Sequence, residues 1–70
     1  MMTNDVEVGI IVTARTEVSE GFFGLKIPPG TQGIVTSIKR YDDVYVEFEL
    51  GRTLVSQPIL CHPTYLDPVQ

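Results

Sequence analysis

Two acidic side chains in the middle of the chain have a spacing that could support chemistry. Glu47 and Glu49 alternate with apolar residues, so on a strand they would share one face with side chains roughly 7 Å apart. At that separation two carboxylates can divide the acid and base roles of hydrolysis. Alternating glutamates also keep the water-facing side of a strand soluble, and we favour this second interpretation.

Cys61 and His62 are the only soft candidates for metal binding or nucleophilic catalysis. A zinc site needs about four ligands, so these two would serve only in a site shared between chains. Cysteine catalysis needs a thiolate of low pKa and an oriented histidine. We expect instead that Cys61 is a small core residue, and that Asp42 and Asp43 form a turn rather than a calcium site. No cofactor, metal or catalytic residue is therefore expected.

The first loop carries two adjacent aromatic residues, Phe22 and Phe23, between glycines. Neighbouring side chains of an extended chain point to opposite sides, so both cannot enter one small core. Either one of them is exposed and marks an interface, or Phe23 is a buried lid with Phe22 packed on Leu25 or Ile27. We favour the interface, in which the outward residues Tyr41, Tyr45, Glu47 and Glu49 would extend the surface presented to a partner.

The elements that position these side chains are short β-strands. β-branched and alternating segments predict strands at 6–13, 34–41, 44–50 and 53–57, with a last short strand at 67–69. In the third of these, Val44, Val46, Phe48 and Leu50 would face the core. Pro58 would end the fourth strand or confine it to a sheet edge, because proline cannot donate to a ladder.

The breakers between the strands predict turns. Residues 16–32 contain too many glycines and prolines for a helix and are expected to form a long, folded-back loop. That loop would end in a type II turn at Pro28-Pro29-Gly30-Thr31. A bulge near Gly33 would reconcile the adjacent apolar residues Ile34 and Val35, and residues 63–66 suit a single 3₁₀ turn.

Seventy residues with a net charge of −4 restrict the possible classes of protein. We expect one domain at 6–70 after a disordered N-terminus at 1–5, with marginal stability that favours self-association or a protein partner. The acidic balance disfavours binding to nucleic acid. One cysteine fits a reducing compartment. Since no segment suits a signal peptide or a membrane span, we expect a cytoplasmic protein that does not enter a membrane. No small-molecule substrate is inferred from the residues.

One stretch resembles a known architecture. Residues 25–35, followed by Val44-Tyr45-Val46-Glu47-Phe48 and closed by Tyr65-Leu66-Asp67-Pro68-Val69, are similar to the run of turn and strand residues in small SH3-like barrels. Such barrels include uncharacterised bacterial and phage proteins, accessory subunits of electron-transfer complexes and the barrel domain of nitrile hydratase β subunits. The resemblance implies an all-β, five-stranded barrel with a long first loop and a 3₁₀ turn before the last strand.

The resemblance is informative about fold and uninformative about activity, because one fold serves many functions. Our preferred prediction is a non-catalytic protein-binding or accessory module, used as a small subunit or a homo-oligomer. One alternative is a nucleic-acid-associated barrel of the KOW type that acts in transcription or translation. Another is an enzyme whose site forms at an oligomer axis.

Overall fold

The computed structural model describes residues 6–21, 24–39 and 43–69. Its regular elements are short strands and one 3₁₀ turn: β1 (Ile11–Ala14), β2 (Val18–Ser19), β3 (Lys26–Ile27), β4 (Gln32–Ile38), β5 (Val44–Phe48), β6 (Ile59–Cys61), η3 (Pro63–Tyr65) and β7 (Leu66–Pro68). The predicted all-β class is therefore confirmed. No helix in the described ranges is long and apolar enough to cross a membrane.

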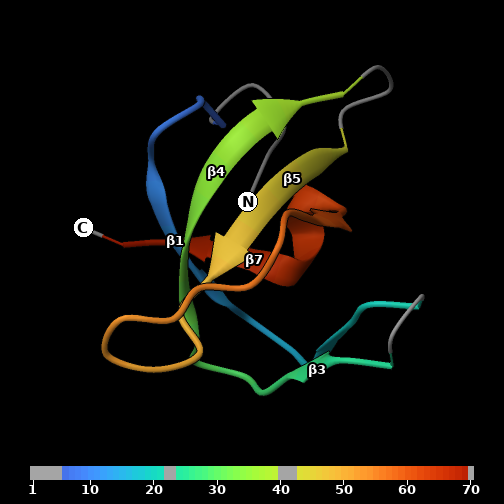
Figure 1. Cartoon of the computed structure of the whole chain (residues 1–70). Coiled ribbons are helices and arrows are strands. Elements are labelled where there is room, and N and C mark those ends of the chain that lie inside the picture. The colour runs from blue at the N-terminus through green and yellow to red at the C-terminus, as the bar shows by residue number, and fades with distance from the viewer. Residues whose placement is uncertain (1–5, 22–23, 40–42, 70) are drawn as a thin grey trace.

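Five of the strands form one curled antiparallel sheet with the shape of a half-barrel (Figure 1). Their order is β6-β5-β4-β1-β7, and β2 pairs with β3 in a separate two-stranded sheet. The first and last strands of the large sheet lie side by side, with Val12 opposite Pro68. This pairing brings the first and the last strand of the described chain together, while β6 and β7, which are consecutive in sequence, lie at opposite edges of the sheet.

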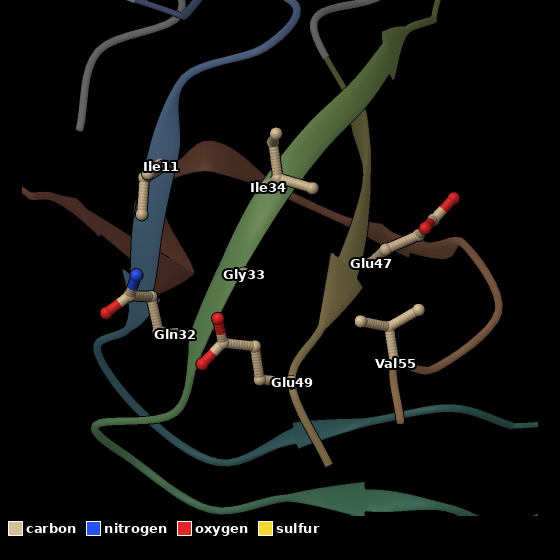
Figure 2. Close-up of a pocket in the computed structure, with 7 residues that line it drawn as sticks. All are labelled: Ile11, Gln32, Gly33, Ile34, Glu47, Glu49 and Val55. Atoms are coloured by element: carbon tan, nitrogen blue, oxygen red, sulfur yellow. The ribbon is translucent and has the colours of Figure 1, made fainter. Parts of the chain in front are cut away.

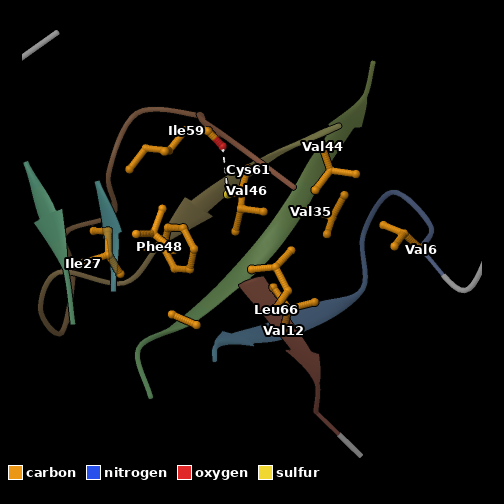
Figure 3. Close-up of a cluster of buried hydrophobic side chains, with 12 residues drawn as sticks. Val6, Val12, Ile27, Val35, Val44, Val46, Phe48, Ile59, Cys61 and Leu66 are labelled. Atoms are coloured by element: carbon orange, nitrogen blue, oxygen red, sulfur yellow. Dashed lines mark hydrogen bonds between the residues drawn. The ribbon is translucent and has the colours of Figure 1, made fainter. Parts of the chain in front are cut away.

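The concave side of the sheet holds the core (Figure 3). In β5 burial alternates, as predicted, with Val44, Val46 and Phe48 fully buried. Leu50 was expected to continue this face, and that prediction is wrong: β5 ends at Phe48 and Leu50 is 42% exposed. The strand pattern in the sequence extends further than the strand, because the chain turns away after its bridge at Glu49.

The predicted fourth strand at 53–57 is also wrong. Residues 51–58 form a loop whose only strand-like contact is the bridge between Glu49 and Val55, and the strand follows Pro58 as β6. β6 pairs with β5 at an edge of the sheet, with Tyr45 opposite Leu60. Pro58 thus precedes the edge strand rather than ending a strand before it. Every residue of β6 therefore keeps a backbone N–H that can donate a hydrogen bond.

Two further expectations shift in position. The first strand was predicted over 6–13, but β1 begins at Ile11 because the chain turns at Gly9, where φ is +95°. The bulge expected near Gly33 lies instead between Val35 and Ser37. The adjacent apolar residues Ile34 and Val35 need no bulge, because they occupy opposite faces of the strand. Val35 is buried, and Ile34 is 41% exposed on the outer face.

The predicted turn before β4 is confirmed. Gly30 has φ +89°, and Thr31 donates a backbone hydrogen bond of 3.3 Å to the carbonyl of Pro28. Gly30 N–H also donates to the Ala14 carbonyl at 2.7 Å, which attaches the turn to the end of β1. Together these bonds fix where β4 begins beside β1. The predicted 3₁₀ turn is confirmed as well, at Pro63–Tyr65.

Candidate functional site

A shallow groove of about 190 Å³ lies on the outer face of the sheet, over β1, β4 and β5 (Figure 2). We call it the outer-face groove. Its walls are mainly apolar, and it is lined by Ile11, Gln32, Gly33, Ile34, Glu47, Glu49 and Val55. Two other hollows are more polar, with polar atoms forming about half of their lining. One, of about 350 Å³, lies beside the first loop, and the other, of about 600 Å³, lies next to the Pro28–Thr31 turn.

Strand register places three side chains in a row across the groove. Ile11 is directly opposite Ile34, and Ile34 is directly opposite Glu47. Val12 and Val35, which follow Ile11 and Ile34 along their strands, are buried and point to the core. Because side chains alternate between the two faces of a strand, Ile11, Ile34 and Glu47 point outward. The isoleucines are 44% and 41% exposed, so the row presents contiguous aliphatic surface to solvent.

The floor of the groove is the backbone of Gly33. A Cβ atom at this position would lie 2.7 Å from Val46 Cγ1, 2.9 Å from the Glu47 carbonyl oxygen and 2.9 Å from Phe48 Cδ1. Real Cβ atoms do not approach other atoms this closely. Glycine at this site therefore lets the ring of Phe48 pack directly against β4. The same backbone separates the groove on one face of the sheet from the core on the other.

The loop after β5 supplies the end of the groove. Glu49 bridges to Val55, which is 53% exposed, and Glu49 N–H donates to the Gln32 carbonyl at 2.8 Å. The loop is held by buried Ser56, whose Oγ accepts a hydrogen bond from Phe48 N–H at 3.0 Å and donates one to the Gln57 carbonyl at 2.8 Å. These bonds fix Val55 beside the two glutamates.

The predicted outward face of β5 is confirmed by this arrangement. Tyr45 and Glu47 are half-buried and Glu49 is exposed, all opposite to the core residues of the strand. Only the two glutamates line the groove. Tyr45 lies beyond it, opposite Ser37 and Leu60, with Lys39 Nζ 5.5 Å from the centre of its ring. Phe22, Phe23 and Tyr41 lie outside the described residues, as do residues 1–5 and Asp42.

The candidate nucleophile has a structural role. Cys61 is 4% exposed, points into the core and donates from its Sγ to the Ile59 carbonyl at 3.4 Å (Figure 3). Burial, with a smaller contribution from the carboxylate of Asp43, raises the pKa of the thiol from 9.0 to about 11. The burial of Cys61 confirms its expected place in the core. Its raised pKa keeps the thiol protonated at neutral pH, which disfavours nucleophilic attack.

His62, next to it in sequence, faces solvent and caps the 3₁₀ turn. Its Nδ1 accepts a hydrogen bond from Thr64 N–H at 3.2 Å and lies 2.9 Å from Thr64 Oγ1. The ring also contacts Tyr65 edge-on, with 6.5 Å between the ring centres. Across the described ranges, no three His, Cys, Asp or Glu side chains are grouped closely enough to hold a metal ion.

Comparison with known proteins gives no relative from which a role could be transferred. No family model, no curated protein and no solved structure matches the chain.

The sequence interpretation missed the apolar half of the groove, Ile11, Ile34 and Val55. A signal for two of them was present: Ile11 precedes Val12 and Ile34 precedes Val35, and alternation requires one residue of each apolar pair to face outward. For Ile34 and Val35 we had instead expected a bulge that would let both residues face the core. No comparable signal exists for Val55, which was assigned to a strand that does not form.

Proposed function

We propose that this chain is a non-catalytic protein-binding or accessory module, built as an SH3-like barrel, whose outer-face groove docks a protein partner. The observation that carries the proposal is the row of Ile11 and Ile34 across two neighbouring strands, both more than two-fifths exposed and bordered by Glu47. Apolar surface enclosed by a polar rim is typical of protein interfaces.

The rigidity of the groove supports this role. The two isoleucines stand on paired strands, and the buried core lies directly behind them. A surface that is ordered before binding loses little conformational entropy when a partner covers it. The sheet therefore presents its aliphatic row in a fixed geometry, as expected of a docking site.

The roles of the reactive side chains also favour binding over catalysis. The Cys61 thiol is protonated and buried, and His62 is engaged in capping η3. The barrel assignment is supported by the order β6-β5-β4-β1-β7, by the long connection between β1 and β4, and by η3 immediately before the closing strand. A second contact surface in the first loop, including Phe22 and Phe23, remains part of the proposal.

Affinity capture from the native host tests the proposal with a matched pair of variants. Ile34→Asp places a charge in the groove, whereas Ile38→Asp places one at the end of the same strand, on a residue of similar exposure that does not line the groove. We expect a partner identified by mass spectrometry to be retained by the wild type and by Ile38→Asp, and lost by Ile34→Asp. A partner retained equally by all three proteins would contradict docking at the groove.

A further inference from the structure

The charges beside the aliphatic row select among possible occupants of the groove. The seven residues that line it include two carboxylates, those of Glu47 and Glu49, and no Lys or Arg. Arg52 lines the adjoining hollow together with Glu49. Of the two carboxylates, that of Glu47 is half-buried and stands directly opposite Ile34, whereas Glu49 is exposed.

A neutral apolar occupant would be disfavoured by Glu47. To cover Ile11 and Ile34, a partner must also remove water from the adjacent carboxylate. Desolvation of an ionised group without a compensating cation or hydrogen bond opposes binding. A partner that brings its own positive charge avoids this cost, because the charge replaces the lost water.

A second copy of this chain would be disfavoured for a related reason. A two-fold interface places the same surface on both sides, so two copies meeting at the groove would bury Glu47 and Glu49 of both chains, with no Lys or Arg in the lining of either groove to pair with them. Each chain also carries a net charge of −4. Like charges held close at an interface oppose association, and the groove therefore does not suit a homodimer.

The strand geometry sets the spacing that such a partner needs. The midpoint between Ile11 and Ile34 lies one and a half strand spacings from Glu47 on β5, which is roughly 7 Å. Residues i and i+2 of an extended segment lie on one face and are also roughly 7 Å apart. An aliphatic side chain seated on the isoleucines would thus place a basic side chain two residues later beside Glu47.

Resting on the proposed function, we infer that the outer-face groove takes a cationic protein segment in which an aliphatic residue and a Lys or Arg share one face. The aliphatic side chain packs on Ile11 and Ile34. The basic side chain pairs with Glu47. Gln32, half-buried at the same groove, offers its amide to the backbone or a polar side chain of the segment.

The inference can be tested with two synthetic peptides that differ only in charge, Thr-Ile-Thr-Lys-Thr-Ile-Thr-Lys and Thr-Ile-Thr-Glu-Thr-Ile-Thr-Glu. Each is titrated into the ¹⁵N-labelled full chain, and amide shifts are followed by NMR. We expect the lysine peptide to shift the amides of Ile11, Ile34 and Glu47, with an affinity that falls as salt is added. The glutamate peptide should leave them unmoved.

Two charge-removing variants locate the effect. Glu47→Gln should weaken the lysine peptide about fivefold, which is about 1 kcal/mol at 1.4 kcal/mol per tenfold. Glu7→Gln changes the net charge equally at an exposed residue that does not line the groove and should leave the affinity within about twofold, because salt screens a solvent-exposed charge that makes no direct contact with the peptide.

Several results would overturn the inference. Equal binding of both peptides at the groove would show that charge does not select the occupant, while docking at the groove itself would stand. Equal weakening by Glu47→Gln and Glu7→Gln would assign the effect to overall charge. If neither peptide binds, or if the chain dimerises through the groove, the cationic segment is refuted, and the Ile34→Asp capture experiment judges the proposed function separately.

Discussion

At the scale of single residues, the contact between Gly33 and Phe48 decides the shape of both faces of the sheet. The ring of Phe48 occupies the space that any side chain at position 33 would need. The same backbone forms the floor of the outer-face groove. One glycine therefore couples the packing of the core to the surface on which the proposed partner would lie.

Gly33→Ala should lower the free energy of unfolding by about 1–3 kcal/mol, because the added methyl group overlaps the Glu47 carbonyl and the Phe48 ring. Urea denaturation measures the loss. Gly51→Ala is the matched control, since a Cβ at Gly51 would meet nothing within 4 Å, and we expect a change within about 0.5 kcal/mol. An equally stable Gly33→Ala protein would show that β4 and β5 are not packed as described.

Cys61 gives a prediction for pH dependence. The folded pKa of its thiol is raised to about 11, above the unfolded value of 9.0, so the folded state holds the proton more strongly. Between these two values the unfolded state binds fewer protons, and stability from this group is complete below pH 9 and is lost as pH rises toward 11.

Urea midpoints measured from pH 8 to 11 should therefore fall more steeply for the wild type than for Cys61→Ala. The comparison cancels the titration of tyrosine and lysine groups, which both proteins share. Parallel pH profiles would indicate that the thiol is as accessible to water in the folded state as in the unfolded chain.

At the scale of elements, a strand such as β5, whose residues alternate between apolar and polar, could be predicted from the sequence. The loop after β5 and the strand β6 that follows it could not. β5 follows from its sequence because each inward residue, Val44, Val46 and Phe48, is apolar, while the intervening Tyr45 and Glu47 each carry a polar group. The turn before β4 also follows, since proline and glycine restrict the backbone locally. These features depend on neighbours in sequence, so local physics is sufficient.

The region after β5 depends on contacts distant in sequence. Residues 53–57 have strand-like composition, yet their pairing with the end of β5 stops at the single bridge between Glu49 and Val55. Phe48 N–H donates to the side-chain Oγ of buried Ser56 rather than to a backbone carbonyl of this segment. β6 forms after Pro58 because Ile59 and Cys61 can then face the core opposite Val46 and Val44. No local pattern distinguishes these alternatives.

The candidate site was predictable in part for the same reason. The outward position of Glu47 follows from alternation within β5, and that of Glu49 from the same alternation one residue past the end of the strand. The aliphatic row depends on which strands pair and in which register, since Ile11 on β1 and Ile34 on β4 are distant in the chain and meet only in the folded sheet. Half of the groove is thus a property of the tertiary structure.

At the scale of the whole molecule, the described residues pack a core on one face of a thin curled sheet and leave part of the other face exposed. The described core fills the concave face, while the convex face keeps Ile11 and Ile34 exposed. In a chain of 70 residues, whose burial on folding gives a small margin of stability, a partner bound to that face would add apolar burial and stabilise the fold. Binding and folding stability are in this way linked.

Site-specific photocrosslinking in the native host tests docking at the outer-face groove most directly. p-Benzoylphenylalanine in place of Ile34 puts the reactive group in the groove, and the same residue in place of Ile38 puts it on a side chain of β4 with closely similar exposure, 45% against 41%, outside the groove. We predict a light-dependent adduct with one partner protein from position 34 and none from position 38. An adduct from position 38 alone, or no adduct from either position, would contradict the account.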